Sequence, residues 1–138
     1  MKDIEYYKSK GELISKGIDI KKSNSLIDAA IESANFAKEI NISDSTATGI
    51  FKSYYDAFHM LGEAKWQRMG YKAGSHYIAL KILKDSKIYK LEHLDTFRTI
   101  RNDISYEGLK ASKDQAKRIK TLWNDVSGQL NKWIRSNI

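Results

Sequence analysis

The chain has 138 residues, of which 41% are hydrophobic and 30% are charged, so it is long enough for one globular domain with its own core. It has no cysteine, which excludes disulfides, thiol catalysis and thiolate metal sites, and no proline, which favours helices. No apolar run reaches the ~20 residues of a membrane-spanning helix, and the first residues do not resemble a signal peptide. We therefore expect a cytoplasmic protein without a membrane partner.

The formal net charge is +7, and most of it lies near the end of the chain. Residues 109–138 hold seven Lys or Arg and two Asp, a formal charge of +5. A basic balance favours anionic partners: RNA, DNA, nucleotides or acidic proteins. The alternative is a lysine-rich helix face that only contacts solvent.

The N-terminal part of the chain predicts two helices. A weakly patterned helix over residues 3–16 is interrupted by Gly11. A second helix over residues 25–40 follows Ser23 or Asn24, either of which can cap its first turn, and carries small and apolar residues along one face.

A long third helix is predicted over residues 45–69. Ser43 or Asp44 is its expected cap, and Gly70 is expected to end it. Apolar residues cover more than one of its faces, so we expect this helix to be central and buried on most sides. Trp66 lies off the main apolar stripe, which indicates a residue that covers a partner.

Three more helices are predicted over residues 75–84, 88–105 and 112–135. Ser75 and Ser112 are the expected N-caps, and the last helix has the most regular apolar stripe. The pattern as a whole predicts an all-α fold, an up-and-down bundle of four to six helices.

We expect residues 1–138 to form a single domain. Residues 1–21 would be a peripheral N-terminal helix, and residues 22–135 would form the core bundle.

The helix over residues 88–105 carries a polar strip beside its apolar strip. Phe97, Ile100 and Ile104 share one arc of the helix. The neighbouring arc holds the polar residues Arg98, Arg101, Asn102, Ser105 and, if the helix continues that far, Tyr106. Guanidinium groups beside an amide and hydroxyls suit a phosphate group. The alternative is that these side chains tie the helix to its neighbours or to a second subunit.

Three stretches, in this order, resemble the motifs of HEPN domains, which are small helical bundles of prokaryotes. Residues 53–59 resemble the tyrosine-rich motif of the family's third helix, and residues 70–76 resemble its turn from glycine to Ser-His. Residues 101–108, preceded by Arg98, resemble the family signature. The resemblance covers residues 22–135.

The resemblance implies a homodimer whose motif helices form an RNA-cleaving cleft that needs no metal. Arg101 would be the motif arginine and Asn102 the polar residue that assists it, with Arg98 and Ser105 as supporting phosphate contacts. Tyr106 occupies the position of the family's histidine, as in a branch with the pattern Arg-Asn-x-x-x-Tyr. A phenol with a pKa near 10 is a poor general base at neutral pH, so the motif itself offers no clear base.

Three hypotheses follow. The first is a HEPN-type protein that binds or acts on RNA or nucleotides, as a metal-independent endoribonuclease of toxin or defence type. The second is a non-catalytic helical module that partners a minimal nucleotidyltransferase acting as its antitoxin, with Tyr106 as a possible acceptor of a nucleotidyl group. The third is a polar strip that only holds a dimer together.

The three histidines are expected to play structural roles. His59 would be a hydrogen-bonded packing residue, His76 would lie at a helix N-terminus, and His93 would be exposed. No pair has the spacing of a helical metal site, and no glycine-rich loop ends in Lys-Ser or Lys-Thr. We expect no metal ion and no cofactor.

Overall fold

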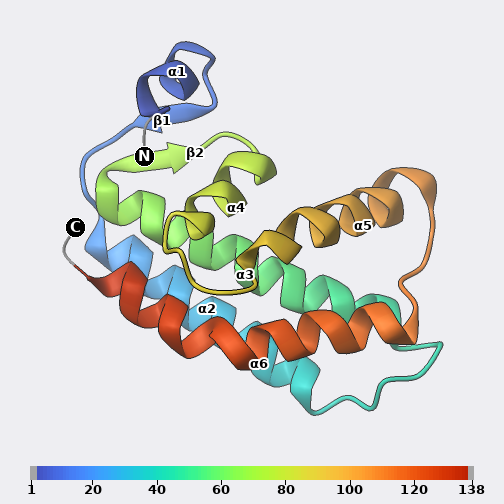
Figure 1. The fold of residues 1–138 in the computed structure, drawn as a ribbon. Helices are drawn as coiled ribbons and strands as arrows, with labels where there is room; N and C mark the ends of the chain where they lie inside the picture. Colours follow the sequence, from blue (N-terminus) through green and yellow to red (C-terminus); the bar gives the residue numbers. More distant parts are fainter. Residues whose placement is uncertain (1–2, 137–138) are drawn as a thin grey trace.

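The computed structural model describes residues 3–136, which form six α-helices, one 3-10 turn and one two-stranded sheet (Figure 1). In chain order the elements are α1 (Ile4–Ser9), β1 (Leu13–Ser15), α2 (Ile20–Lys38), α3 (Ala47–Met69), β2 (Tyr71–Ala73), α4 (His76–Lys84), η1 (Leu91–His93), α5 (Leu94–Glu107) and α6 (Lys113–Arg135). The predicted all-α bundle is confirmed. Within the described range, no helix is both long enough and apolar enough to cross a membrane.

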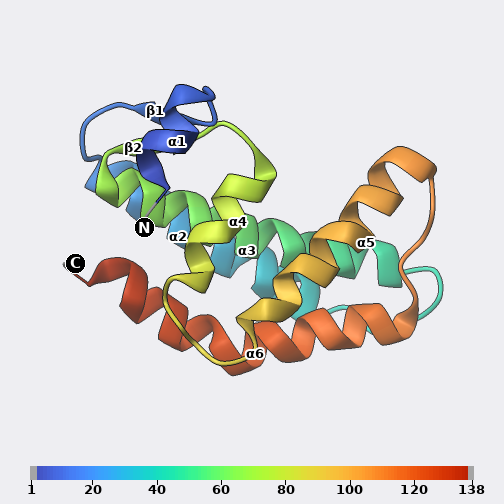
Figure 2. The same ribbon diagram turned by 45° about the horizontal axis from the view of Figure 1, so that its top comes forward.

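Helix α3 is the central helix, as predicted, and it contacts α2, α4 and α6 (Figures 1 and 2). The prediction for Trp66 is wrong: its side chain is fully buried and its Nε1 donates a hydrogen bond to the carbonyl oxygen of Ile78 at 2.9 Å. Because α3 is covered on several sides, a residue off its main apolar stripe still faces protein.

The ends of the later helices follow their capping residues. The Ser75 hydroxyl accepts from the backbone N–H of Ile78 at 3.2 Å and begins α4. Ser112 and Gln115 form a reciprocal capping box at the start of α6. Gly70 ends α3 in a left-handed conformation with φ of +92°. These predictions are confirmed.

The N-terminal part differs from the predicted helices. Helix α1 ends at Ser9, and β1 pairs antiparallel with β2 in a register that places Leu13 opposite Ala73. The pairing buries the Leu13 side chain, which a helix over residues 3–16 would not explain. Figures 1 and 2 show α1 and β1 at one end of the molecule. The division into residues 1–21 and 22–135 stays a prediction.

Two predicted caps are wrong. Helix α2 begins five residues earlier than expected, because Asp19 accepts a hydrogen bond from the backbone N–H of Lys22 at 2.8 Å. Ser23 is instead fully buried inside the helix. Helix α3 begins at Ala47, and no side chain caps its first turn.

Helices α3 and α4 cross at very short range at Gly62. A Cβ atom at this position would lie 1.8 Å from the carbonyl oxygen of Ala79. Only glycine permits that approach, which sets the first turn of α4 beside the middle of α3.

Helix α5 packs less tightly than the other long helices. Only Leu94 and Phe97 of α5 are buried, and the Phe97 ring packs edge-on against Phe51 at a centroid distance of 5.8 Å. The helix continues to Glu107 and ends at Gly108 with φ of +67°. Figure 2 shows its C-terminal half projecting away from α3 and α6.

Candidate functional site

The polar residues predicted on α5 divide between two sides of the helix. Arg98 and Arg101 are half-buried, and a guanidinium nitrogen of Arg101 donates to the hydroxyl of Ser105. Asn102 is exposed, and Tyr106 is 82% exposed. Five residues along a helix correspond to a rotation of about 140° from Arg101, so Tyr106 does not share the side of the arginines.

The two arginines lie against tyrosine rings of neighbouring helices. The Cζ of Arg101 is 6.0 Å from the ring centroid of Tyr55 on α3, and that of Arg98 is 5.2 Å from the centroid of Tyr77 on α4. Neither forms an ion pair within residues 3–136, and the Nε of each is buried without a hydrogen-bond partner. Their positive charge is therefore not neutralised locally.

Two histidines lie beside the same tyrosine. The ring of His76 stacks on Tyr55 at a centroid distance of 6.5 Å and an interplanar angle of 17°. The rings of His59 and His76 are 4.2 Å apart. We define the Arg–His cluster as the six residues Tyr55, His59, His76, Tyr77, Arg98 and Arg101.

The three histidine predictions have different outcomes. His76 occupies the first turn of α4 and His93 is exposed, as expected. His59 packs inside, but its buried Nε2 has no hydrogen-bond partner in the described part of the chain, so the predicted hydrogen bond is wrong.

Unsatisfied polar atoms concentrate in the cluster. In residues 3–136, seven buried side-chain nitrogen or oxygen atoms have no hydrogen-bond partner. Four of them belong to the Arg–His cluster: the hydroxyl of Tyr55, Nε2 of His59 and the Nε atoms of Arg98 and Arg101. Because buried polar atoms are nearly always paired in stable cores, these four atoms take their partners from ordered water, an ion or a ligand.

Burial changes the protonation of the α3 side chains. It raises the pKa of Tyr55 to about 12, against the opposing charges of Arg98 and Arg101. Burial, with the charge of His76, lowers the pKa of His59 to about 4. At neutral pH the cluster therefore holds a neutral phenol that can donate a hydrogen bond and a neutral buried imidazole.

An acidic residue borders the cluster on α3. Burial raises the pKa of Glu63, and the nearby charges of Lys72 and His76 oppose the change. Tyr55, His59 and Glu63 follow one another at four-residue intervals, so they line one face of α3 toward the first turn of α4.

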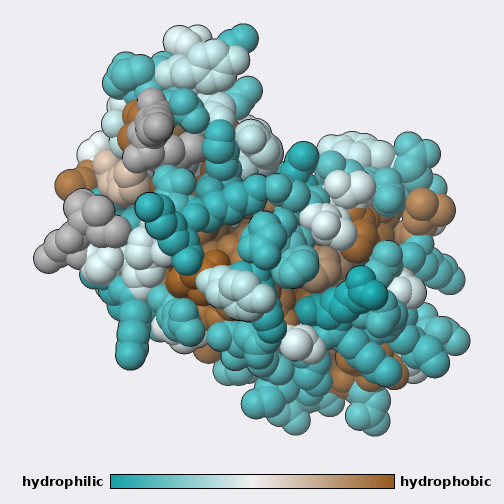
Figure 3. Space-filling view, in the orientation of Figure 1, coloured by the Kyte–Doolittle hydropathy of each residue, from teal (hydrophilic) through white to brown (hydrophobic). Residues whose placement is uncertain are grey.

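The surface is hollowed beside the cluster. The outline in Figure 3 is notched between the part that carries α1 and the sheet, at the upper left, and α5, at the upper right. Figures 1 and 2 show that the first turn of α4 and helix α5 border this notch.

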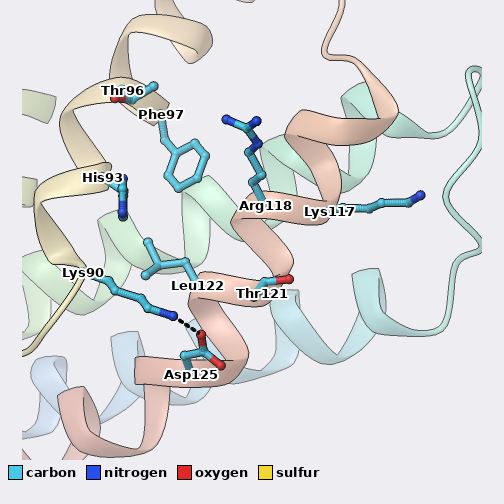
Figure 4. A pocket seen from close by; sticks show the side chains of 9 residues that line it. All are labelled: Lys90, His93, Thr96, Phe97, Lys117, Arg118, Thr121, Leu122 and Asp125. Atoms are coloured by element: carbon cyan, nitrogen blue, oxygen red, sulfur yellow. Dashed lines mark hydrogen bonds and ion pairs between the residues drawn. The ribbon is translucent and has the colours of Figure 1, made fainter.

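A second cavity lies between α5 and α6 and has a volume of about 400 Å³ (Figure 4). It is basic, but its cations are partly paired. Lys90 contacts Asp125 at 3.1 Å, and Nε of Arg118 contacts Asp114 at 2.8 Å. Figure 4 shows Lys117 pointing away from the cavity. The cavity is therefore less suited to a phosphate than the Arg–His cluster.

The described residues offer no set of ligands for a metal ion. Over residues 3–136, no group of three or more His, Cys, Asp or Glu side chains is arranged to hold a metal ion. His59, His76 and Glu63 are side chains of metal-binding types, but they do not form such a group.

Comparison with family models, with curated proteins and with solved structures finds no match to this chain. The HEPN resemblance therefore stays a prediction that depends on the motif residues.

Sequence patterns identified only two of the six cluster residues as members of a site. Arg98 and Arg101 were predicted from their position on one helix. Tyr55, His59 and His76 lie within the two other motif stretches, and the four-residue spacing of Tyr55 and His59 is the one signal that these two share a face. Their meeting with α5 depends on the crossing of α3 and α4.

Proposed function

We propose that the chain is a HEPN-type RNA-binding protein, acting as a metal-independent endoribonuclease of toxin or defence type, in which the Arg–His cluster binds the phosphodiester backbone. The observation that carries the proposal is the pair of half-buried arginines without a carboxylate partner. A phosphate offers several acceptor oxygens for the exposed N–H groups of these guanidiniums and a negative charge to balance them.

The aromatic members favour RNA over a free phosphate ion. Tyr77 is 39% exposed and lies under Arg98, so part of its ring can stack with a base. Single-stranded RNA is bound in this way, by cations along the backbone and aromatic rings against the bases.

A homodimer is part of this proposal. The projecting end of α5 exposes Tyr106 at 82% and is followed by Leu109 at 56%. A second copy that covers these side chains would bring two α5 helices together, as the HEPN resemblance implies. The exposed apolar surface supports this arrangement.

A second candidate function is a non-catalytic module that partners a minimal nucleotidyltransferase. The observation that favours it is the exposure of Tyr106 at the end of a projecting helix, where its hydroxyl is accessible to a modifying enzyme. Incorporation of labelled AMP by such an enzyme into the wild type, and not into Tyr106→Phe, would support this candidate.

The first proposal is tested by fluorescence anisotropy of a labelled single-stranded RNA. We expect Arg101→Ala to weaken binding at least tenfold, because the lost guanidinium is only partly exposed and has no carboxylate partner among the described residues. Arg118→Ala removes the same charge from an exposed, paired position on α6, and we expect less than a twofold change.

The two variants separate a site from a general charge effect. Equal losses in Arg101→Ala and Arg118→Ala, or no binding by the wild type at low salt, would contradict the proposal. The wild-type affinity should fall steeply as salt increases, because bound phosphates release counterions.

A further inference from the structure

The HEPN-like motif on α5 lacks a general base, and the fold brings two histidines to the same place from other helices. His76 is exposed in the first turn of α4, whereas its neighbour His59 on α3 is half-buried. The motif residues alone do not indicate this meeting.

Arg101 and His76 both neighbour the buried ring of Tyr55. The His76 ring centroid and the Arg101 Cζ both lie within 6.5 Å of the Tyr55 ring centroid. A phosphate held by Arg98 and Arg101 would lie beside Tyr55, the ring that His76 also contacts.

We infer that His76 is a catalytic residue of the proposed ribonuclease and takes the proton of the ribose 2′-hydroxyl. This inference rests on the proposed function. The 2′ oxygen attacks the adjacent phosphorus, an O2′–P bond forms and the P–O5′ bond breaks. The proton then returns to the 5′ oxygen, so the products are a 2′,3′-cyclic phosphate and a 5′-hydroxyl. No water, metal or other co-reactant is consumed.

The surroundings of His76 suit this role. Imidazole is the side chain best matched to proton transfer near neutral pH. The rings of Tyr55 and His59 both lie beside the His76 ring, which is nevertheless exposed to solvent. Arg98 and Arg101 would stabilise the extra negative charge that develops on the phosphorane. Tyr106 is not required for any of these steps.

The test follows cleavage of a labelled RNA by the full chain in the presence of EDTA, beside binding of the same RNA. We expect the wild type to produce 2′,3′-cyclic phosphate ends and to leave an all-2′-deoxy strand intact. His76→Ala should lose roughly 100-fold or more in rate, the usual contribution of a general acid–base group, and should bind RNA nearly as well.

Two further measurements separate chemistry from folding. Imidazole added to His76→Ala should restore part of the lost rate, because the position is open to solvent. His93→Ala, which removes an exposed histidine outside the cluster, should cleave like the wild type. The circular dichroism of all three proteins should agree, and His76→Gln should replace His76→Ala if it does not.

The outcomes are distinguishable. RNA that is bound and cut equally by the wild type and by His76→Ala would overturn the role of His76 and leave the ribonuclease standing. RNA that is bound but never cut would overturn the inference and leave RNA binding. A chain that binds no RNA would overturn both the inference and the proposed function.

Discussion

Arg98 and Arg101 differ from other cations of the chain in their surroundings. Lys84, Lys90 and Arg118 each form an ion pair with a carboxylate at the surface. The two α5 arginines contact tyrosine rings, and their Nε atoms are buried without partners. A partly desolvated cation binds an anion more strongly than an exposed one, because the local dielectric constant is lower. We therefore assign the proposed phosphate binding to these two residues rather than to the net charge.

The low pKa of His59 predicts how the stability of the protein depends on pH. Its pKa is about 4 in the folded protein and about 6.5 in an unfolded chain. Between these values the unfolded state binds more protons, so stability is lost as the pH falls from about 6.5 toward about 4. The free energy of unfolding should lose roughly 2 kcal/mol from His59 between about pH 7 and about pH 5.

The measurement is urea unfolding of the wild type and His59→Phe at both pH values. Phenylalanine does not titrate, so the variant should lose roughly 2 kcal/mol less than the wild type over this range. His93→Ala, with an exposed histidine removed, should retain the wild-type dependence. If His59→Phe also retained the wild-type dependence of stability on pH, His59 would not be a buried neutral imidazole.

At the scale of elements, the crossing of α3 and α4 positions the histidines. Gly62→Ala would place a Cβ atom 1.8 Å from the carbonyl oxygen of Ala79, so one helix must move. We expect a loss of about 1–3 kcal/mol in the free energy of unfolding, the usual cost of overpacking. RNA cleavage should fall further than stability alone explains, because His76 moves with α4.

Gly128 of α6 provides the matched control for Gly62. A Cβ at Gly128 would meet no atom within 4 Å, so Gly128→Ala should stabilise the protein by about 0.5–1 kcal/mol through helix propensity. The measurement is chemical unfolding of both variants. An equal effect of the two substitutions would show that the close crossing does not constrain the fold.

Local sequence signals account for the elements that were predicted well. Ser75, Ser112 and Gly70 act through hydrogen bonds and backbone conformations within a few residues of themselves. The strand pair was not predicted, because β1 and β2 have three residues each and come from distant parts of the chain. No periodic pattern can develop over so short a segment.

The same limit applies to the candidate site. The arginines share one helix, so helical spacing alone predicts that they lie together. His59 and His76 come from two helices, and their contact depends on where Gly62 allows those helices to cross. A pattern within one element cannot indicate a contact of this kind.

At the scale of the whole molecule, the charge of +7 would attract RNA without deciding where the RNA binds. The basic cavity beside α6 in Figure 4 and the Arg–His cluster are the two candidate places. The cavity lies between α5 and α6, whereas the arginines of the cluster contact α3 and α4, and each place contains histidine. His93 lines the cavity, whereas His59 and His76 belong to the cluster.

That distribution allows one measurement to test the central claim, which is that RNA binds at the Arg–His cluster. The protein is labelled with ¹⁵N in its histidine side chains and titrated with a short single-stranded RNA at constant pH, and the three imidazole signals are followed by NMR. Our account predicts that the signals of His76 and His59 shift with the RNA while that of His93 stays in place. A shift confined to His93 would place the RNA in the cavity beside α6 and contradict the account.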